Sequence, residues 1–504
     1  MKRFAVKILP FLIVLTVFGC RIRPFDDIST DGIDAEWALP LVDTERSFGD
    51  IIKGFDPQAF VQIAADGSIV LHYKGNFIAR NSLDIFANFN NTAFPLTDTV
   101  MAVPFTLPSG VHVDYVDVKR GILNWGILIP SSETSLKVNL MIPQLTKNGV
   151  AFQKQFFVYP GFPKLDTLDM SGYNLTPIKD SIYIIHDARR TDGTRVNLAS
   201  RAIFQIQNFE FKFAKGYFGQ DLFDVPRDTI PIDFFQQWKD GQVRFSDPKL
   251  TVSLDNSFGV PVRAVMSVGD IISVDGSRLP LRSPLTAGVN VNYPTIQQVG
   301  QTKRTVIVFD KTNSNIADII SSNPVAIDYK IDGLINPDSN RTIVGFMTDT
   351  SSFKLQVELE VPMSGAAKNF AVTDTFKIDL SGGGKELTKA EFKILTDNGM
   401  PIDVTLQGYF ATADGIVLDS MFTPQKATIL RGAPVGNDGL PTGVSTAENY
   451  VTLDAAKLKK VRGAQKLIVR YAFSTTNGGS VPVKLKAAQS VRIRIGVKFG
   501  YKTL

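Results

Sequence analysis

Side chains that could do catalytic or metal chemistry are few in this chain of 504 residues, and they are widely spaced. The three histidines, His72, His112 and His186, each lie in a strand-like stretch with no second nitrogen or sulfur ligand at zinc-site spacing. Ser351 and Lys354 match a Ser-x-x-Lys pair, but the Lys-Thr-Gly that accompanies this pair in penicillin-binding enzymes is absent. These residues indicate neither a metal site nor a nucleophile.

Glu358 and Glu360 have the spacing of two neighbours on one face of a strand, which places their Cα atoms about 7 Å apart. A carboxylate pair hydrolyses glycosides where a pocket gives the two groups unequal pKa values. The alternation with Val357, Leu359 and Val361 instead predicts a sheet with one apolar and one wet face. We therefore expect this pair to lie on a solvated sheet surface.

Two further stretches lack the residues that their chemistry needs. Residues 381–384, Ser-Gly-Gly-Gly, precede Lys385, but the next residue is glutamate where a phosphate loop has serine or threonine. Asp31, Asp34 and Glu36 do not have the spacing of a calcium-binding EF-hand loop. We predict a non-enzymatic protein without a catalytic residue, metal or cofactor, while an active site assembled from dispersed residues stays open.

The one cysteine, Cys20, ends an N-terminal segment with the layout of a secretory signal. Three of the first seven residues are basic, and residues 8–18 form an apolar run shorter than the roughly 20 residues of a membrane-spanning helix. Residues 17–20, Val-Phe-Gly-Cys, resemble the bacterial lipobox. The resemblance implies cleavage after residue 19 and acylation of both the Cys20 sulfur and the new amine. Stable anchoring needs more than one acyl chain, and this modification supplies it.

The residues behind the cysteine bear on location. In Gram-negative lipoproteins an aspartate directly after the cysteine is associated with inner-membrane retention, and this chain has Arg21 there. The resemblance therefore implies a lipid anchor in the outer membrane. Asp26 and Asp27 come later than the acidic export signal of Bacteroidota surface lipoproteins. The periplasmic and the cell-surface face both stay open.

Composition favours a folded protein that has no nucleic-acid partner. Hydrophobic residues make up 44% and charged residues 20% of the chain, which is enough apolar material for packed cores. The net charge of +5 is too small to imply a polyanion partner. With Cys20 lipidated, no cysteine remains for an internal disulfide, so stability must come from packing.

The body of the chain has the pattern of antiparallel strands. Two apolar runs, residues 60–63 and 69–73, flank an Asp-Gly turn, and this is a strong hairpin signal. Apolar and polar residues alternate at 209–213, 354–361 and 491–499. We predict an all-β fold of multidomain antiparallel β-sandwich-like modules with a few short helices. The expected helices are at residues 454–463, 314–321 and 233–241.

A diffuse internal repeat indicates how the modules are arranged. Residues 250–266 can be aligned with residues 392–406, because in each a strand runs into Asp-Asn, a glycine-containing turn and an apolar-Pro-apolar strand entry. The prolines, Pro261 and Pro401, are 140 residues apart, which is a domain-sized period. Residues 86–96 resemble a weaker third copy.

The repeat and the turn signals give a linear division of the chain. It consists of a signal peptide (1–19), a lipidated tether (20–32), an N-terminal β domain (33–165), a second β region (166–248), a β-sandwich-like domain (249–380) and a related C-terminal sandwich (381–504).

Phenylalanine dominates the aromatic residues. The chain has 36 Phe, 12 Tyr and 3 Trp, the last being Trp37, Trp125 and Trp238. Because phenylalanine has no polar edge, clusters such as 209–213 and 152–159 are expected in the core more than on a sugar-binding face.

The lipobox, residues 37–42 (Trp-Ala-Leu-Pro-Leu-Val) and the β-rich modules together are similar to uncharacterised outer-membrane lipoproteins of Bacteroidota. We expect a membrane-anchored binding, adhesion or assembly module, with an envelope protein or a glycan as partner. The alternatives are a carbohydrate-binding surface lipoprotein and a carrier of lipid or another hydrophobic ligand. The residues of a ligand site cannot be named from the sequence.

Replacing Cys20 with alanine tests the proposed anchor. Cys20→Ala should abolish palmitate labelling and move the protein from the membrane to the soluble fraction, while its circular dichroism stays that of folded β protein. Membrane fractionation and metabolic palmitate labelling measure the two effects. Unchanged labelling and fractionation would contradict the lipobox interpretation.

Overall fold

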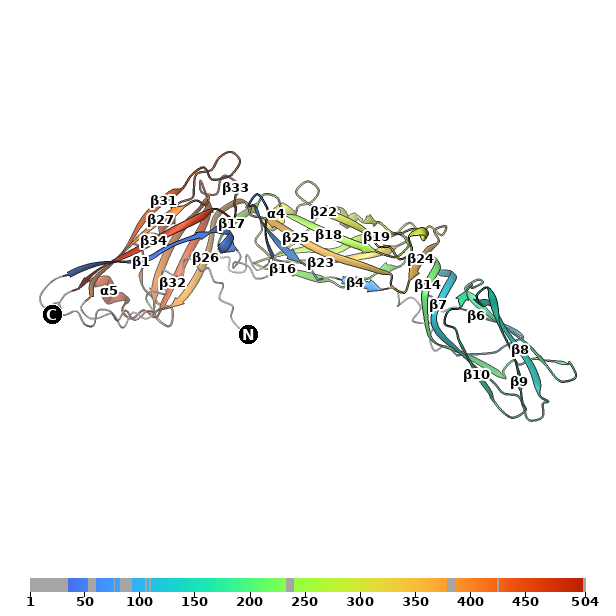
Figure 1. The fold of residues 1–504 in the computed structure, drawn as a ribbon. Helices are drawn as coiled ribbons and strands as arrows, with labels where there is room; N and C mark the ends of the chain where they lie inside the picture. The colour runs from blue at the N-terminus through green and yellow to red at the C-terminus, as the bar shows by residue number, and fades with distance from the viewer. Residues whose placement is uncertain are drawn as a thin grey trace.

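The computed structural model describes residues 35–52, 60–76, 78–81, 93–104, 107, 110–232, 240–378, 387–423 and 426–501. Strand makes up 61% and helix 6% of these described residues, and the sheets are antiparallel, so the predicted all-β fold is confirmed. Figure 1 shows three modules in a row. We call them the tip module, the central sandwich and the C-terminal sandwich.

The C-terminal sandwich packs a four-stranded sheet against a seven-stranded sheet. The first sheet has the order β1 (Ala35–Ser47), β34 (Ser490–Tyr501), β27 (Leu387–Asn398) and β31 (Ser445–Asp454). The second has β17 (Asp240–Phe245), β26 (Ser364–Lys377), β32 (Lys466–Thr475), β28 (Ile402–Ala411) and β29 (Val417–Ser420), with β30 (Ala427–Leu430) on β28 and β33 (Val483–Lys484) on β26.

The central sandwich has two six-stranded sheets. One contains β2 (Phe60–Ile63), β3 (Ile69–Lys74), β25 (Ser352–Pro362), β18 (Lys249–Asn256) and β22 (Lys303–Phe309), with β4 (Ile78–Asn81) on β25. The other contains β15 (Leu222–Phe223), β23 (Pro324–Ile335), β19 (Val262–Ser273) and β20 (Arg278–Pro280), with β16 (Asp228–Pro231) on β23 and β21 (Val289–Val291) on β19.

The tip module is one eleven-stranded sheet. Its main order is β13 (Arg195–Val196), β12 (Ser181–Arg189), β8 (Leu136–Lys147), β11 (Asn174–Leu175), β7 (Val111–Ile127), β14 (Ala202–Phe218) and β24 (Gly345–Thr348). The others are β5 (Ala93–Pro95), β6 (Val100–Pro104), β9 (Val150–Val158) and β10 (Lys164–Asp169). Strand β24 lies in the sequence between β23 and β25 of the central sandwich. Its pairing with β14 therefore joins the tip module to the central sandwich.

The chain visits the modules in an order that differs from the linear division expected from the sequence. Strand β1 lies in the C-terminal sandwich beside β34, whereas β2–β4 lie in the central sandwich and β5–β10 in the tip module. The stretch 33–165 is therefore spread over three modules. Strand β17, from the expected region 166–248, also pairs with β26 of the C-terminal sandwich. The module that each strand joins is decided by pairing between strands that are distant in the sequence. The local pattern of apolar and polar residues does not contain this information.

The two aligned motifs occupy matching places in the two sandwiches. Asn256 ends β18 and Asn398 ends β27, and in each case the chain then crosses to the opposite sheet as β19 or β28. Both asparagines are fully buried. The side-chain Oδ1 accepts from the backbone N–H two residues on, at 3.0 Å from Phe258 and 2.9 Å from Met400. Residues 86–92 of the weaker third copy lie outside the described residues.

Two of the expected helices are present and short. Helix α5 (Ala455–Val461) has Asp454 as its N-cap, with the carboxylate accepting from Lys457 N at 2.8 Å. Helix α4 (Ile316–Ile320) is the second, and α2 (Phe48–Ile52) and α3 (Pro284–Ala287) were not expected. Residues 233–239 of the third candidate lie outside the described part of the chain.

The predicted aromatic core is confirmed only in part, because Phe157 and Tyr159 of the cluster 152–159 are 51% and 58% exposed. Phe209 and Phe211 are 2% and 1% exposed, and Phe213 is half-buried beside a register shift in β14. Trp125 is 2% exposed and packs between Phe152 and Phe156 in the tip module. One of the three tryptophans is therefore a core residue.

The buried corner asparagine of the C-terminal sandwich gives a stability prediction. Asn398→Ala leaves Met400 N, Ile402 O and Arg431 O without their side-chain partner. We expect the free energy of unfolding to fall by at least about 2 kcal/mol, because each buried polar group left unpaired costs roughly 1–3 kcal/mol.

Urea unfolding measures this loss, and Asn449→Ala is the control. Asn449 donates to Thr428 O in an exposed contact, so its replacement should change stability by less than about 0.5 kcal/mol. Equal effects of the two variants would show that the corner contacts are not what stabilises the sandwich.

Candidate ligand-binding cavity

Some of the residues singled out from the sequence lie outside the described part of the structure. Another has a structural role. Cys20 and Trp238 lie outside the described residues, and Trp37 lies in β1 with an undescribed side chain. Ser351 is 1% exposed, and its hydroxyl accepts from Thr348 N at 2.8 Å and donates to Ser257 O at 3.2 Å. This hydroxyl holds a turn, which does not fit a nucleophile.

The outer face of β25 carries the two glutamates expected there. Val357, Leu359 and Val361 are buried on the other face, and Glu358 and Glu360 are only partly exposed. The structure adds a neighbour that sequence spacing missed. His72 of β3, which is 286 positions away, lies beside them with Nδ1 at 2.8 Å from a Glu358 oxygen.

The C-terminal sandwich contains a cavity of about 220 Å³ between its two sheets. Apolar side chains from both sheets and from α2 form its wall. The main ones are Phe48, Ile52, Phe245, Met363, Phe370, Met400, Val404, Leu406, Phe473, Val491 and Ile493. The inward positions of β28 and β34 follow the period of two, so the same alternation that makes the strands also lines the cavity.

Four described residues at the wall carry hydroxyl groups, and the hydroxyls of Tyr471, Ser474 and Thr475 are bonded within the protein. Tyr471 donates its hydroxyl to Asp374, and burial together with this bond holds the pKa of Tyr471 above its usual value. Thr475 Oγ1 lies 3.3 Å from Ala367 N, which donates to it. Arg244 and Ser364 are the other polar side chains among the described residues at the wall, which is otherwise apolar.

Comparison of the two sandwiches explains why space is left here. In the central sandwich, Phe258 and Phe353 pack around Phe223 with ring centroids at 5.1 and 6.0 Å. Phe258 follows its corner asparagine by two residues, as Met400 does in the C-terminal sandwich.

The residue paired with the corner asparagine is also smaller in the C-terminal sandwich. Asn256 pairs with Phe353, whereas Asn398 pairs with Val491. Two aromatic rings in one sandwich thus correspond to methionine and valine in the other, and Met400 and Val491 both line the cavity.

Apolar side chains that face this space lack packing partners on one side, and such missing contacts reduce stability. Apolar cavities of about 150 Å³ stay dry and bind benzene-sized molecules. The cavity can therefore hold a somewhat larger apolar group, and filling it would recover much of the lost stability.

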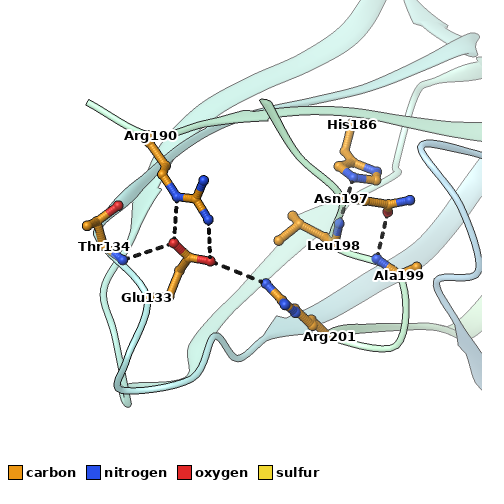
Figure 2. A network of polar contacts seen from close by, with 8 residues as sticks. All are labelled: Glu133, Thr134, His186, Arg190, Asn197, Leu198, Ala199 and Arg201. Atoms are coloured by element: carbon orange, nitrogen blue, oxygen red, sulfur yellow. Dashed lines mark hydrogen bonds and ion pairs between the residues drawn. The ribbon is translucent and has the colours of Figure 1, made fainter. Parts of the chain in front are cut away.

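A polar network in the tip module is shown in Figure 2. Arg190 donates to both Glu133 oxygens at 2.7 and 3.1 Å, and Arg201 lies 3.7 Å from the same carboxylate. The Arg190 hydrogen bond is the main reason that the pKa of Glu133 falls to about 2. Both guanidinium groups are committed to a carboxylate of the same chain, so the network ties loops together.

His186 lies beside this network in a buried position (Figure 2). It is 2% exposed, and its Nε2 accepts from Leu198 N at 3.1 Å. Its Nδ1 is buried and has no hydrogen-bond partner among the described residues. Burial lowers the pKa of His186. The third histidine, His112, is more exposed, and its Nδ1 lies 2.5 Å from Asp180.

Comparisons with known proteins give distant likenesses. No family model and no curated protein matches the chain. A protein of Parabacteroides distasonis described as secreted has 12% identity and a TM-score of 0.30, and the match covers 93% of this chain and 100% of that one. A structure of the Gx strain of infectious bursal disease virus has 8% identity and a TM-score of 0.16, covering 88% and 81%. An isomalto-dextranase of Arthrobacter globiformis has 9% identity and a TM-score of 0.12, covering 57% and 36%. These similarities assign no function.

The helices of the described residues are all too short, or too polar, to cross a membrane.

Because His186 is buried, we predict that the protein loses stability as the pH falls. Its pKa is lower in the folded than in the unfolded protein, so its neutral form contributes fully above the unfolded value of about 6.5 and the contribution is lost as pH falls. Between pH 7.5 and 5.5 we expect the free energy of unfolding to drop by up to about 1.4 kcal/mol for each pH unit below the unfolded-state pKa of about 6.5. Urea unfolding at both pH values should show a smaller drop for His186→Gln. His112→Gln keeps His186 and should behave like the wild type; identical acid losses in all three proteins would contradict this assignment.

Proposed function

We propose that this chain is a non-enzymatic lipoprotein of the bacterial outer membrane that holds an apolar ligand inside its C-terminal sandwich. The anchor is proposed from Cys20 and the segment before it. The observation that supports ligand binding is the apolar cavity of about 220 Å³ between the two sheets. Of the expected functions, carrying a lipid or another hydrophobic ligand is the one that requires such a space.

The cavity wall defines the chemistry of the ligand. Because the wall is mostly apolar and the Tyr471, Ser474 and Thr475 hydroxyls are bonded within the protein, a charged or strongly polar group inside would lose its hydration without replacement. The buried part of the ligand is therefore a hydrocarbon, such as a segment of an acyl chain. Arg244 is one of the residues at the cavity wall. Its guanidinium group would suit a polar end of the ligand at the boundary of the cavity.

The other two functions remain proposals with less support. Binding of a protein partner is supported by apolar side chains exposed on the tip module, where Phe162 and Leu165 are 73% and 72% exposed. Glycan binding through tryptophan is weakened by Trp125, which lies in the core.

The residue difference between the sandwiches supplies a direct test of ligand binding. Val491→Phe places at the cavity wall the ring that Phe353 supplies in the central sandwich. Wild-type protein should bind the apolar fluorescent probe N-phenyl-1-naphthylamine with saturation near one probe per chain. Val491→Phe should lose this binding and be as stable as the wild type or more so, because the ring fills existing space.

The same substitution away from the cavity is the control. Val469 is 3% exposed on the inner side of β32 and does not line the cavity, so Val469→Phe should lower stability by about 1–3 kcal/mol through overpacking. It should keep probe binding in the folded protein. Absence of saturable binding to the wild type, or equal binding to Val491→Phe, would contradict the proposed function.

A further inference from the structure

A histidine and two glutamates meet on the outer face of the central sandwich. In the antiparallel register, Glu360 of β25 is opposite His72 of β3, and Glu358 is opposite Lys74. One nitrogen of His72 and one oxygen of each glutamate all lie within 4.8 Å of one another. No other group of three possible metal ligands this close occurs among the described residues.

The fold holds these side chains on one face. Leu71 and Tyr73 of β3 and Leu359 of β25 are buried toward the core, so the residues between them point outward. The ring of Phe60, on β2, meets His72 edge-on with centroids 6.3 Å apart. The His72 side chain is only 11% exposed as a result. An imidazole packed in this way has few rotamers to lose when it binds an ion.

The hydrogen bonding of the cluster is incomplete. His72 Nδ1 is 2.8 Å from a Glu358 oxygen, while Nε2 is buried with no partner among the described residues. The cation near the glutamates is Lys74, whose Nζ is 3.7 Å from Glu358 and whose side chain is 54% exposed. Such a long, exposed contact contributes little and can be displaced.

The spacing suits a small divalent ion. Imidazole and carboxylate donors sit about 2.0–2.2 Å from Zn²⁺, so donors that share one ion lie roughly 3–3.5 Å from each other. The observed 2.8 Å contact needs only a small opening to admit an ion. We propose that His72, Glu358 and Glu360 form a binding site for a divalent transition-metal ion such as Zn²⁺.

The donor set also discriminates between ions. Ca²⁺ and Mg²⁺ take oxygen ligands and gain little from an imidazole, whereas Zn²⁺ uses nitrogen and oxygen together. Three protein ligands leave a position of the ion open to water or to a group from a partner. The bound ion would also link β3 to β25, which are 286 residues apart at His72 and Glu358. The site lies in the central sandwich, so it is independent of the proposed ligand cavity.

The test uses the untagged chain from residue 20 onward carrying Cys20→Ala. This protein has no thiol and three histidines, so few other zinc ligands compete. Isothermal titration with Zn²⁺ should show one site per chain, weaker at pH 6 than at pH 7.5 because the ion competes with protons for the imidazole. Mg²⁺ and Ca²⁺ should give no comparable heat. Saturating Zn²⁺ should raise the unfolding temperature.

Variants separate a metal site from an ordinary ion-pair ladder. Glu360→Gln and His72→Gln should each weaken Zn²⁺ binding at least tenfold, since even outer-shell partners of metal ligands are worth roughly 10- to 100-fold in affinity. Lys74→Gln should tighten binding, because it removes the cation that competes for Glu358. His112→Gln is the matched control, since His112 has one carboxylate partner, Asp180, and should leave binding unchanged.

The proposal is overturned if Zn²⁺ does not bind, if binding is unchanged in Glu360→Gln and His72→Gln, or if His112→Gln weakens binding as much as these two variants do. The circular dichroism of each variant shows whether a loss of binding is local. Because Glu358 and Glu360 are partly exposed, the glutamine variants are expected to fold.

Discussion

The pairing of β1 with β34 is the constraint on which the C-terminal sandwich and its cavity depend. The register runs from Ala35 opposite Tyr501 to Ser47 opposite Ser490, so nearly the whole of β1 is in contact with the last strand. The two hydrogen bonds from Arg492 to Asp43, at 2.9 and 2.7 Å, cross this pair. The guanidinium lowers the pKa of Asp43, so the carboxylate stays ionised in neutral solution.

Helix α2 follows β1 directly, and the pairing therefore also positions a wall of the cavity. Phe48 N donates to Gln489 O at 2.7 Å at this junction, and Phe48 and Ile52 both line the cavity. If the tether of residues 20–32 carries lipid, the segment that anchors the protein is separated by only a few residues from a strand of the ligand-binding module. The proposed anchor is then adjacent in sequence to the module that contains the proposed ligand site.

The architecture could be predicted from the sequence to the level of strands and corners. Alternation at residues 354–361 identified β25, and the aligned Asp-Asn motifs marked the corners at Asn256 and Asn398. The path of the chain could not be predicted, because no local pattern in β1 or β17 identifies its partner strand. Strand β1 pairs with β34 at the other end of the chain, and β17 pairs with β26, which follows more than a hundred residues later. Sheet partners are chosen by burial of a shared apolar face, which is a long-range property.

The candidate sites divide in the same way. Phe258 and Met400 each follow the Asn of the aligned motifs by two residues, which is visible in the sequence, but the change from Phe353 to Val491 needs the strand register. The cluster of His72, Glu358 and Glu360 had no local signal at all. Spacing along one strand predicted a wet face for the glutamates, and only the neighbouring strand brings an imidazole to it.

The most direct measurement of the central claim is the content of the cavity in protein taken from cells. The chain carrying Cys20→Ala, which has no covalent lipid in our account, would be purified without detergent and extracted with organic solvent, and the extract analysed by mass spectrometry against the same preparation of Val491→Phe. We predict that close to one apolar molecule per chain is released from the parent protein and far less from Val491→Phe. An extract free of apolar molecules, or equal amounts from both proteins, would contradict the claim that the C-terminal sandwich holds a hydrophobic ligand.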